Sequence, residues 1–468
     1  MAFMDSIQQA LKAYQLARTA AAAGDVPDDH YNHGYWAARL GQWQEAIHAY
    51  HRALGFGVAK PEEVWLNIGS IYSERLQQRD KALEALDESL RLNPNYTAAM
   101  FNQGHLAEQY GDREAAHHWF AQVIAREPNN TAALARLADA SIVTADDDPV
   151  LLKLRAAAPA AANPDVWLSL AAAEEALDNF DAAWQAMLAA NTIDRQQSPP
   201  YPAEKIAELN HLAKQIDISR TKSTDSDTNT NGPLFICGMF RSGSTLLEQM
   251  LAAHGAFFPL GESEFWPRRI ATAGGGMVFP AREPSAEEMT QWRAQHQKML
   301  SELVPEGKIA TDKRPDNIYQ IHLLGQVLPA AKFVITRRDW RDTLVSVFGT
   351  RLHAQHGYAN DLCSIRQQIR LLDDLADSWA ARYPDRIRIV EYEALVADAE
   401  STLADLLKWL GQPWRPEMLN FHSLRNSVRT ASVWQVREPL NNKRQARWRR
   451  FEKPLHAVFG DSLNTPKA

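Results

Sequence analysis

The first residues whose types and spacing could do chemistry are Gly238 and Gly243, which are separated by four residues and followed by Ser244 and Thr245. This spacing is typical of a phosphate-binding loop, in which backbone N–H groups and a helix N-terminus cradle phosphate oxygens. Nucleotide hydrolases carry a lysine directly after the second glycine, where this chain has Ser244. Arg241 within the loop can instead hold a phosphate through two parallel hydrogen bonds. The loop therefore predicts phosphate binding and argues against ATP or GTP hydrolysis.

The run GMFRSGSTLLEQ resembles the 5′-phosphosulfate loop of sulfotransferases, in particular the bacterial type fused to tetratricopeptide repeats and the related tyrosylprotein sulfotransferases. That family usually has proline where Phe240 stands and threonine where Ser244 stands, and both changes keep the backbone donors and a hydroxyl. The resemblance covers about residues 233–455. It implies that the donor 3′-phosphoadenosine 5′-phosphosulfate (PAPS) is bound by Arg241, Ser242, Gly243, Ser244 and Thr245.

A second motif, KFVITRRDWRDTLVSVF, places Arg338 and Ser346 eight residues apart, at the start and about two turns along an expected helix. The pair resembles the family's site for the ribose 3′-phosphate of the donor. A hydrolysable nucleoside triphosphate has no 3′-phosphate, so this pair is the feature that best distinguishes a PAPS site from an ATP or GTP site. The competing interpretation is an exposed, salt-bridged helix start, because the run RRDWRD mixes charges.

The resemblance also implies catalytic groups. Lys313, in ATDKRPDN, matches the lysine that stabilises charge developing on the leaving phosphate, although a surface lysine beside two aspartates is the alternative. GESEFWPRR supplies two candidates for the general base, of which Glu262 is favoured over Glu264. His254 is a weaker third candidate, and a hydrogen-bonded role at a helix end suits it better.

Three further donor-binding residues are expected from the C-terminal part. Tyr392, in RIRIVEYEALVAD, resembles the family's tyrosine beside the nucleotide, with a plain core role as the alternative. Residues 425–453 hold nine Lys or Arg against two acids, and Ser432 and Arg447 match a serine and a basic residue that close the donor pocket. A solvated charged face is the competing interpretation. Nucleic-acid binding is not expected, because no known module accompanies this stretch and the formal net charge is -7.

Short apolar runs predict the elements that position these residues. Leu234–Cys237, Lys332–Thr336 and the run RIRIV are expected to form buried parallel strands, and apolar residues with a helical period follow Thr245. We expect an α/β, P-loop-like domain with a parallel sheet flanked by helices. Its site should lie at the carboxyl ends of the strands, where the motifs fall.

The first half repeats a pattern of a glycine, an alanine twelve or thirteen positions later, and a large apolar residue four further on. The triplets are Gly34, Ala46 and Tyr50; Gly69, Ala82 and Leu86; and Gly104, Ala116 and Phe120. The glycines recur every 35 residues, and Pro94 and Pro128 follow the second and third units. We expect helix hairpins in which the glycines permit close approach and the large residues fill the groove between neighbouring pairs.

This pattern resembles the tetratricopeptide repeat over about residues 25–195, with a fourth unit around Trp167, Ala171, Ala183 and Met187. The alternative is an alanine-rich helical bundle without repeats. Such arrays hold peptides or proteins, and bracing of the second domain or self-association is an equal possibility. We expect an all-α array over 1–217, a polar linker over 218–232 and the sulfotransferase domain over 233–468.

Composition sets the remaining expectations. The chain has 468 residues, of which 45% are hydrophobic and 23% charged, as in ordinary globular proteins. Two cysteines are too few for a disulfide framework or a cysteine zinc site, and no signal peptide or membrane span is evident. We therefore expect a cytoplasmic enzyme that needs no metal.

The motifs together predict transfer of a sulfuryl group from PAPS to a hydroxyl acceptor: a peptide, a sugar, a lipid or a small molecule. The repeats mildly favour a peptide or protein acceptor. Gly274, Gly275 and Gly276 suggest a mobile loop near the acceptor. Two alternatives stay open: a kinase or NTPase with a degenerate loop, against which Ser244 argues, and a scaffold in which the second domain is inactive.

Overall fold

The computed structural model describes residues 2–197, 232–273, 282–442, 444–465 and 467–468. They form two compact units, the first reaching residue 143 and including 147–157, the second containing 144–146 and everything from 158 onward. The expected linker, except Gly232, and the expected glycine loop at 274–276 lie outside the described residues. The predicted domain boundary at 218–232 therefore stays a prediction. The second unit includes the last helical hairpin as well as the sheet.

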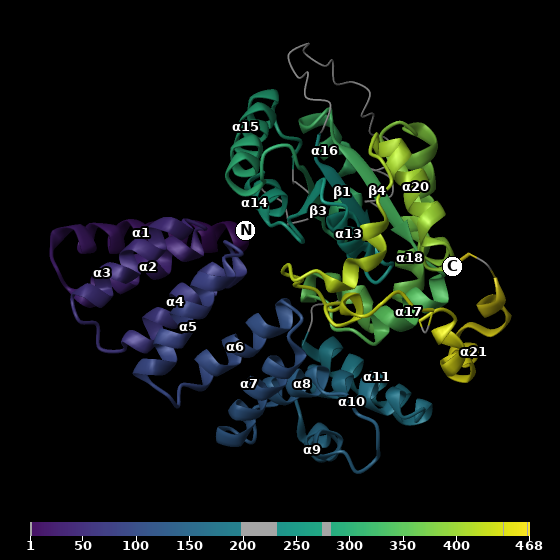
Figure 1. Cartoon of the computed structure of the whole chain (residues 1–468), viewed down its shortest axis with the longest axis horizontal. Helices are drawn as coiled ribbons and strands as arrows, with labels where there is room; N and C mark the ends of the chain where they lie inside the picture. The colour runs from purple at the N-terminus through teal and green to yellow at the C-terminus, as the bar shows by residue number, and fades with distance from the viewer. Residues whose placement is uncertain (1, 198–231, 274–281, 443, 466) are drawn as a thin grey trace. The chain divides into compact units, whose positions relative to one another are not determined.

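The first unit is a succession of helices joined by short turns (Figure 1). Its helices are α1 Ala2–Ala23, α2 Pro27–Arg39, α3 Trp43–Gly55, α4 Pro61–Glu74, α5 Arg79–Leu92, α6 Thr97–Gln109, α7 Arg113–Arg126, α8 Thr131–Ala140 and α9 Pro149–Ala157. Helices α5 and α7 both end before the prolines that were expected to stop them. The expected repeat array of helix hairpins is confirmed.

Each repeat glycine lies against the large apolar residue of its own hairpin. A β-carbon on Gly34 would stand 2.7 Å from a ring carbon of Tyr50, and one on Gly104 would stand 2.6 Å from Phe120. Gly69 meets Leu86 at 2.9 Å in the same way. The glycines therefore permit the close approach that was predicted. The large residues also join buried clusters with the next hairpin, Tyr50 with Val64 and Ile68 and Leu86 with Leu106, which agrees with their expected place between neighbouring pairs.

The second unit contains a five-stranded, all-parallel sheet in the order β2-β3-β1-β4-β5. Its strands are β1 Leu234–Gly238, β2 Phe257–Pro259, β3 Ile309–Lys313, β4 Lys332–Arg337 and β5 Ile387–Glu391. The three strands expected from apolar runs are present, and the parallel sheet is confirmed. Strands β2 and β3 were not predicted. The first is very short, and the second ends in the polar residues Thr311, Asp312 and Lys313, which are nevertheless buried.

The second unit also contains helices, some of which cover the sheet (Figure 1). They are α10 Pro164–Ala176, α11 Phe180–Gln197, α13 Ser244–Ala253, α14 Phe265–Thr272, α15 Ala286–Leu303, α16 Ile321–Val327, α17 Trp340–Phe348, α18 Leu362–Arg382, α19 Tyr392–Ala397, α20 Ala399–Leu410 and α21 Glu452–Phe459. Leu234 and Ile236 of β1 join a buried cluster with α13 and α20, while Phe235 stacks on Phe333 at 5.3 Å between ring centres. None of the helices in the described ranges has the length and apolar composition of a membrane crossing.

Candidate active site

A cavity of about 480 Å³ opens where β1, β3 and β4 end, which is the expected place for a ligand in a parallel α/β sheet. Ten residues singled out from the sequence line it: Arg241, Gly243, Ser244, Thr245, Glu262, Glu264, Lys313, Arg338, Tyr392 and Ser432. The fold therefore brings together residues that are up to 191 positions apart in the chain.

The phosphate loop follows a backbone path that requires glycine at two positions. Gly238 has φ 135° and a β-carbon there would meet the carbonyl oxygen of Thr336, while Gly243 has φ 100°. A β-carbon on Gly243 would stand 2.7 Å from Tyr392, so loop and tyrosine are in close contact. Ser242 is buried behind the loop, where its Oγ donates to the carbonyl of Met239 at 2.6 Å. Ser242 thus supports the loop and does not line the cavity.

Arg241 connects three segments of the site. Its Nε donates to Oγ of Ser346 at 3.1 Å, and its two terminal nitrogens donate to Oγ of Ser432 at 2.5 Å and to Oε1 of Gln435 at 3.1 Å. Ser346 lies on α17 and is reached through this contact, although it does not itself line the cavity. Arg241 also has a left-handed φ of 70°, which directs it away from an ordinary helical or extended path.

Four arginines gather around this point, and they repel one another. Burial, followed by the charges of Arg444, Arg338 and Arg447, lowers the pKa of Arg241. The buried Nε of Arg338 has no hydrogen-bond partner among the described residues, and the guanidinium of Arg338 lies over the ring of Tyr392 at 4.5 Å. An unpartnered buried donor within a cluster of like charges fits a bound anion, because an anion relieves both penalties. The residues present therefore suit the phosphates of the expected donor.

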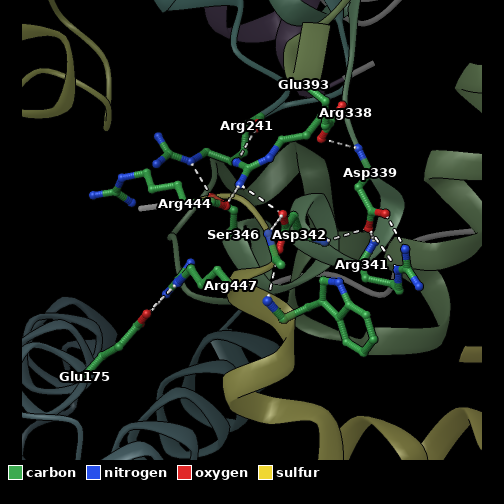
Figure 2. Close-up of polar contacts among 12 residues, drawn as sticks. Glu175, Arg241, Arg338, Asp339, Arg341, Asp342, Ser346, Glu393, Arg444 and Arg447 are labelled. Atoms are coloured by element: carbon green, nitrogen blue, oxygen red, sulfur yellow. Dashed lines mark hydrogen bonds and ion pairs between the residues drawn. The ribbon is translucent and has the colours of Figure 1, made fainter. Parts of the chain in front are cut away.

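Arg447 is not on the cavity, contrary to the placement that the sequence suggested. Its Nε and Nη2 bind the two carboxylate oxygens of Glu175 on α10, at 2.7 and 2.5 Å (Figure 2). Arg444, three residues earlier, lines the cavity in its place. The choice between Arg444 and Arg447 could not be made in advance, because it depends on a carboxylate 272 residues from Arg447.

Lys313 and Glu262 form an ion pair at the other side of the cavity, with 2.7 Å between Nζ and Oε1. The lysine side chain is only 1% exposed, so the alternative of a surface lysine is not what the structure shows. Glu264 is more exposed and pairs with Arg268 at 2.7 Å. His254 lies elsewhere, with Nε2 hydrogen-bonded to the carbonyl of Pro413 at 2.7 Å, which agrees with its expected helix-end role.

Two residues near the pair were missed in the sequence. Glu248 on α13 accepts hydrogen bonds from the backbone N–H of Gly261 at 3.2 Å and from Oγ1 of Thr311 at 3.3 Å, and burial raises its pKa to about 7. It thereby supports the turn that carries Glu262. His356 lines the cavity and its ring lies 4.6 Å from that of Phe240. Glu248 belongs to the run GMFRSGSTLLEQ, which resembles the phosphosulfate loop, but nothing else in the sequence marks it. No motif marks His356.

Residues 233–416 match the model of the sulfotransferase family, and residues 62–96 match that of the tetratricopeptide repeat. A protein-tyrosine sulfotransferase 1 of Danio rerio is 26% identical over 259 residues, which cover 51% of this chain and 72% of that protein. An uncharacterized protein of Aquifex aeolicus (strain VF5) is 25% identical over 411 residues, 83% of this chain and 53% of that protein. The chain thus spans about half the length of the Aquifex relative.

Among solved structures, the sulfotransferase domain of the Synechococcus PCC 7002 olefin synthase is similar, with a TM-score of 0.34 and 20% identity over 47% of this chain and 87% of that one. The described residues contain no group of three or more side chains that could hold a metal ion. By its sequence matches, the chain carries a sulfotransferase-family domain at residues 233–416 together with a tetratricopeptide repeat at residues 62–96.

Proposed function

We propose that the second unit transfers a sulfuryl group from PAPS to a hydroxyl acceptor. The observation that carries the proposal is the convergence on one cavity of a lysine-free phosphate loop, an arginine cluster and the Lys313–Glu262 ion pair. A loop alone would suit many nucleotides. A buried cation paired with a carboxylate beside that loop supplies the two groups that sulfuryl transfer to a hydroxyl requires.

The donor would be held at its two phosphate ends. Backbone donors of the loop, with Ser244 and Thr245 at the start of α13, would bind the phosphosulfate, because a helix N-terminus favours an anion. Arg338, with its unpartnered Nε, would bind the ribose 3′-phosphate together with Ser346. Arg241 joins both ends, since it belongs to the loop and donates to Ser346.

When bound, PAPS supplies the sulfuryl group and a stable leaving group, adenosine 3′,5′-bisphosphate. Lys313 is held at the end of β3 with its charge facing the cavity, where it stabilises negative charge on the leaving phosphate. Glu262 faces the same cavity and accepts the proton of the acceptor hydroxyl at a carboxylate oxygen. Glu264 is the weaker candidate, because it is more exposed than Glu262 and its partner is Arg268, whereas Glu262 contacts the proposed catalytic Lys313.

The acceptor that we propose to test first is a tyrosyl peptide. Support comes from the relatives named protein-tyrosine sulfotransferases and from the helical repeats, a class of domain that binds peptides. We keep a cytoplasmic location and a metal-free reaction as parts of the same proposal.

The test is transfer of radiolabelled sulfate from PAPS to a tyrosyl peptide by the full chain, with sulfate-ester formation as the readout. We expect activity without added metal in the wild type and its loss in Lys313→Met and Glu262→Gln. Wild-type activity in both variants would refute the assignment of Lys313 and Glu262 as catalytic residues. Phosphate release from ATP by the same preparation would favour a nucleotide hydrolase instead.

A further inference from the structure

Residues 444–450 form a strap whose first residue, Arg444, lines the cavity, and Arg338 and α17 hold its backbone. Arg338 donates to the carbonyl of Arg444. The carboxylate of Asp342 accepts from the backbone N–H groups of Ala446 and Trp448, at 2.8 and 2.9 Å (Figure 2). Ala446 adopts a left-handed φ of 55°, so the strap turns sharply there. These contacts fix the path of the chain on the side of the strap that faces α17.

Glu175 of α10 holds the opposite side of the strap. Its carboxylate makes the paired hydrogen bonds with Arg447 and also meets Nη1 of Arg450 at 3.0 Å. The side chains of Glu175 and Arg447 are 11% and 13% exposed, so water screens the pair weakly. Burial alone would raise the pKa of Glu175, but the two arginines lower it below its ordinary value. Glu175 is therefore a firmly ionised anchor.

The hairpin that carries Glu175 is seated on the same helix as the predicted phosphate ligand Ser346. Nδ2 of Asn191 on α11 donates to the carbonyl of Phe348, the last residue of α17, at 2.8 Å. The ring of Trp184 lies 5.4 Å from that of Phe348 and 5.6 Å from that of Phe451, which directly follows the strap. The hairpin α10–α11 thus packs against both elements that border the arginine cluster.

We infer that Glu175 is a positioning residue for donor binding, acting through Arg447 to keep Arg444 directed into the cavity. The inference rests on the proposed function. Arg444 lines the cavity, and among the described residues its guanidinium has no hydrogen-bond or ion-pair partner. Desolvation and then the charge of Arg447 lower the pKa of Arg444, and Glu175 opposes them. Without the carboxylate, Arg447 would be an uncompensated cation that repels Arg444 from its place beside the donor phosphate.

The experiment uses the full chain and needs no acceptor. The affinities of wild type and Glu175→Gln for adenosine 3′,5′-bisphosphate and for adenosine 5′-phosphate are measured by calorimetry. We expect the bisphosphate to bind about tenfold more weakly to the variant, equivalent to about 1.4 kcal/mol. The 5′-phosphate should change less than about twofold, because the strap lies at the Arg338 side of the cavity. Glu175→Asp should recover part of the loss.

A matched control is Asp181→Asn, which removes one negative charge from the exposed first turn of α11 and should leave both affinities unchanged. The double variant Glu175→Gln, Arg447→Met should bind the bisphosphate no more weakly than Arg447→Met alone, because the two substitutions break the same ion pair. If Glu175→Gln does not fold, Arg447→Met tests the ion pair in another way: the freed Glu175 carboxylate, which already attracts Arg444, should draw that arginine out of the cavity and weaken bisphosphate binding about tenfold.

Unchanged bisphosphate affinity in Glu175→Gln, or an equal loss for both nucleotides, would overturn the positioning role. Tighter binding would overturn it as well, and would mean that Glu175 competes with the donor for Arg447. A wild type that binds both nucleotides equally removes the proposed function itself. That result is distinguishable, because it is seen before any variant is made.

Discussion

Replacement of Arg338 by lysine tests whether this residue binds the 3′-phosphate in the proposed donor site. Lysine keeps a positive charge near Asp342, which lies 3.6 Å from the arginine, but it loses the planar fork and the unpartnered Nε–H. A hydrogen bond to a charged group is worth about 1.5–3 kcal/mol, and one such bond is lost on the 3′-phosphate. We therefore expect adenosine 3′,5′-bisphosphate to bind about 10- to 100-fold more weakly.

The assay is calorimetric titration of Arg338→Lys with the bisphosphate and with adenosine 5′-phosphate. The second nucleotide lacks the 3′-phosphate, so its affinity should fall less than about threefold. Arg337→Lys is the control, because this neighbouring guanidinium binds Glu391 and Asp377, at 2.8 and 2.6 Å, and does not line the cavity. Melting temperatures of both variants report whether the fold is kept. An equal loss for the two nucleotides would refute the assignment of Arg338 to the 3′-phosphate, as would an unchanged affinity for the bisphosphate.

Four further expectations follow from the same contacts. Lys313→Met should lower kcat for transfer to a tyrosyl peptide about 10²- to 10³-fold while bisphosphate affinity changes little, and a changed affinity with normal kcat would contradict the charge-stabilising role. Gly243→Ala should weaken the binding of both nucleotides more than tenfold, because Gly243 has a φ of 100° and contacts Tyr392. Gly255→Ala, at a φ of 81° but with no neighbouring atoms, should change neither affinity. Gly104→Ala should destabilise the repeats by about 1–3 kcal/mol in urea unfolding, and Gly55→Ala, with nothing nearby, should not; equal effects would refute the close-packing account. Burial raises the pKa of Glu248 from 4.5 to about 7, so the stability that this carboxyl contributes is lost as pH rises through that interval. The free energy of unfolding of Glu248→Gln, measured in urea, should therefore rise relative to wild type by up to about 3 kcal/mol between pH 4.5 and 8, and a difference that does not change with pH would contradict this account.

Much of the fold could be predicted because its signals are local. Leu234–Cys237 is an apolar run and Lys332–Thr336 has the apolar centre Phe333–Ile335; both runs predict buried strands, and they lie in β1 and β4. The repeat glycines were recognisable by their period, and each meets a large side chain at the predicted spacing within its hairpin. The strand β3 was not predictable in this way, since its polar side chains are accommodated only by partners elsewhere in the chain, such as Asn317 for Asp312.

The candidate site shows the same division. The loop and Arg338 are placed by the ends of strands, so their presence at one cavity could be expected from topology. The identity of the C-terminal arginine at that cavity could not be expected, because Glu175 binds Arg447 and it is Arg444 that lines the cavity. Contacts of this kind join distant segments through single side chains, and no periodicity or motif in one sequence records them.

The central claim is that the cavity binds a nucleotide carrying a 3′-phosphate, and calorimetry of the wild-type chain tests it most directly. Adenosine 3′,5′-bisphosphate, adenosine 5′-phosphate and ATP are titrated separately, without metal and with magnesium. We predict that the bisphosphate binds at least tenfold more tightly than either other nucleotide and that magnesium leaves this preference unchanged. Equal affinity for ATP, or binding only when magnesium is added, would contradict the account.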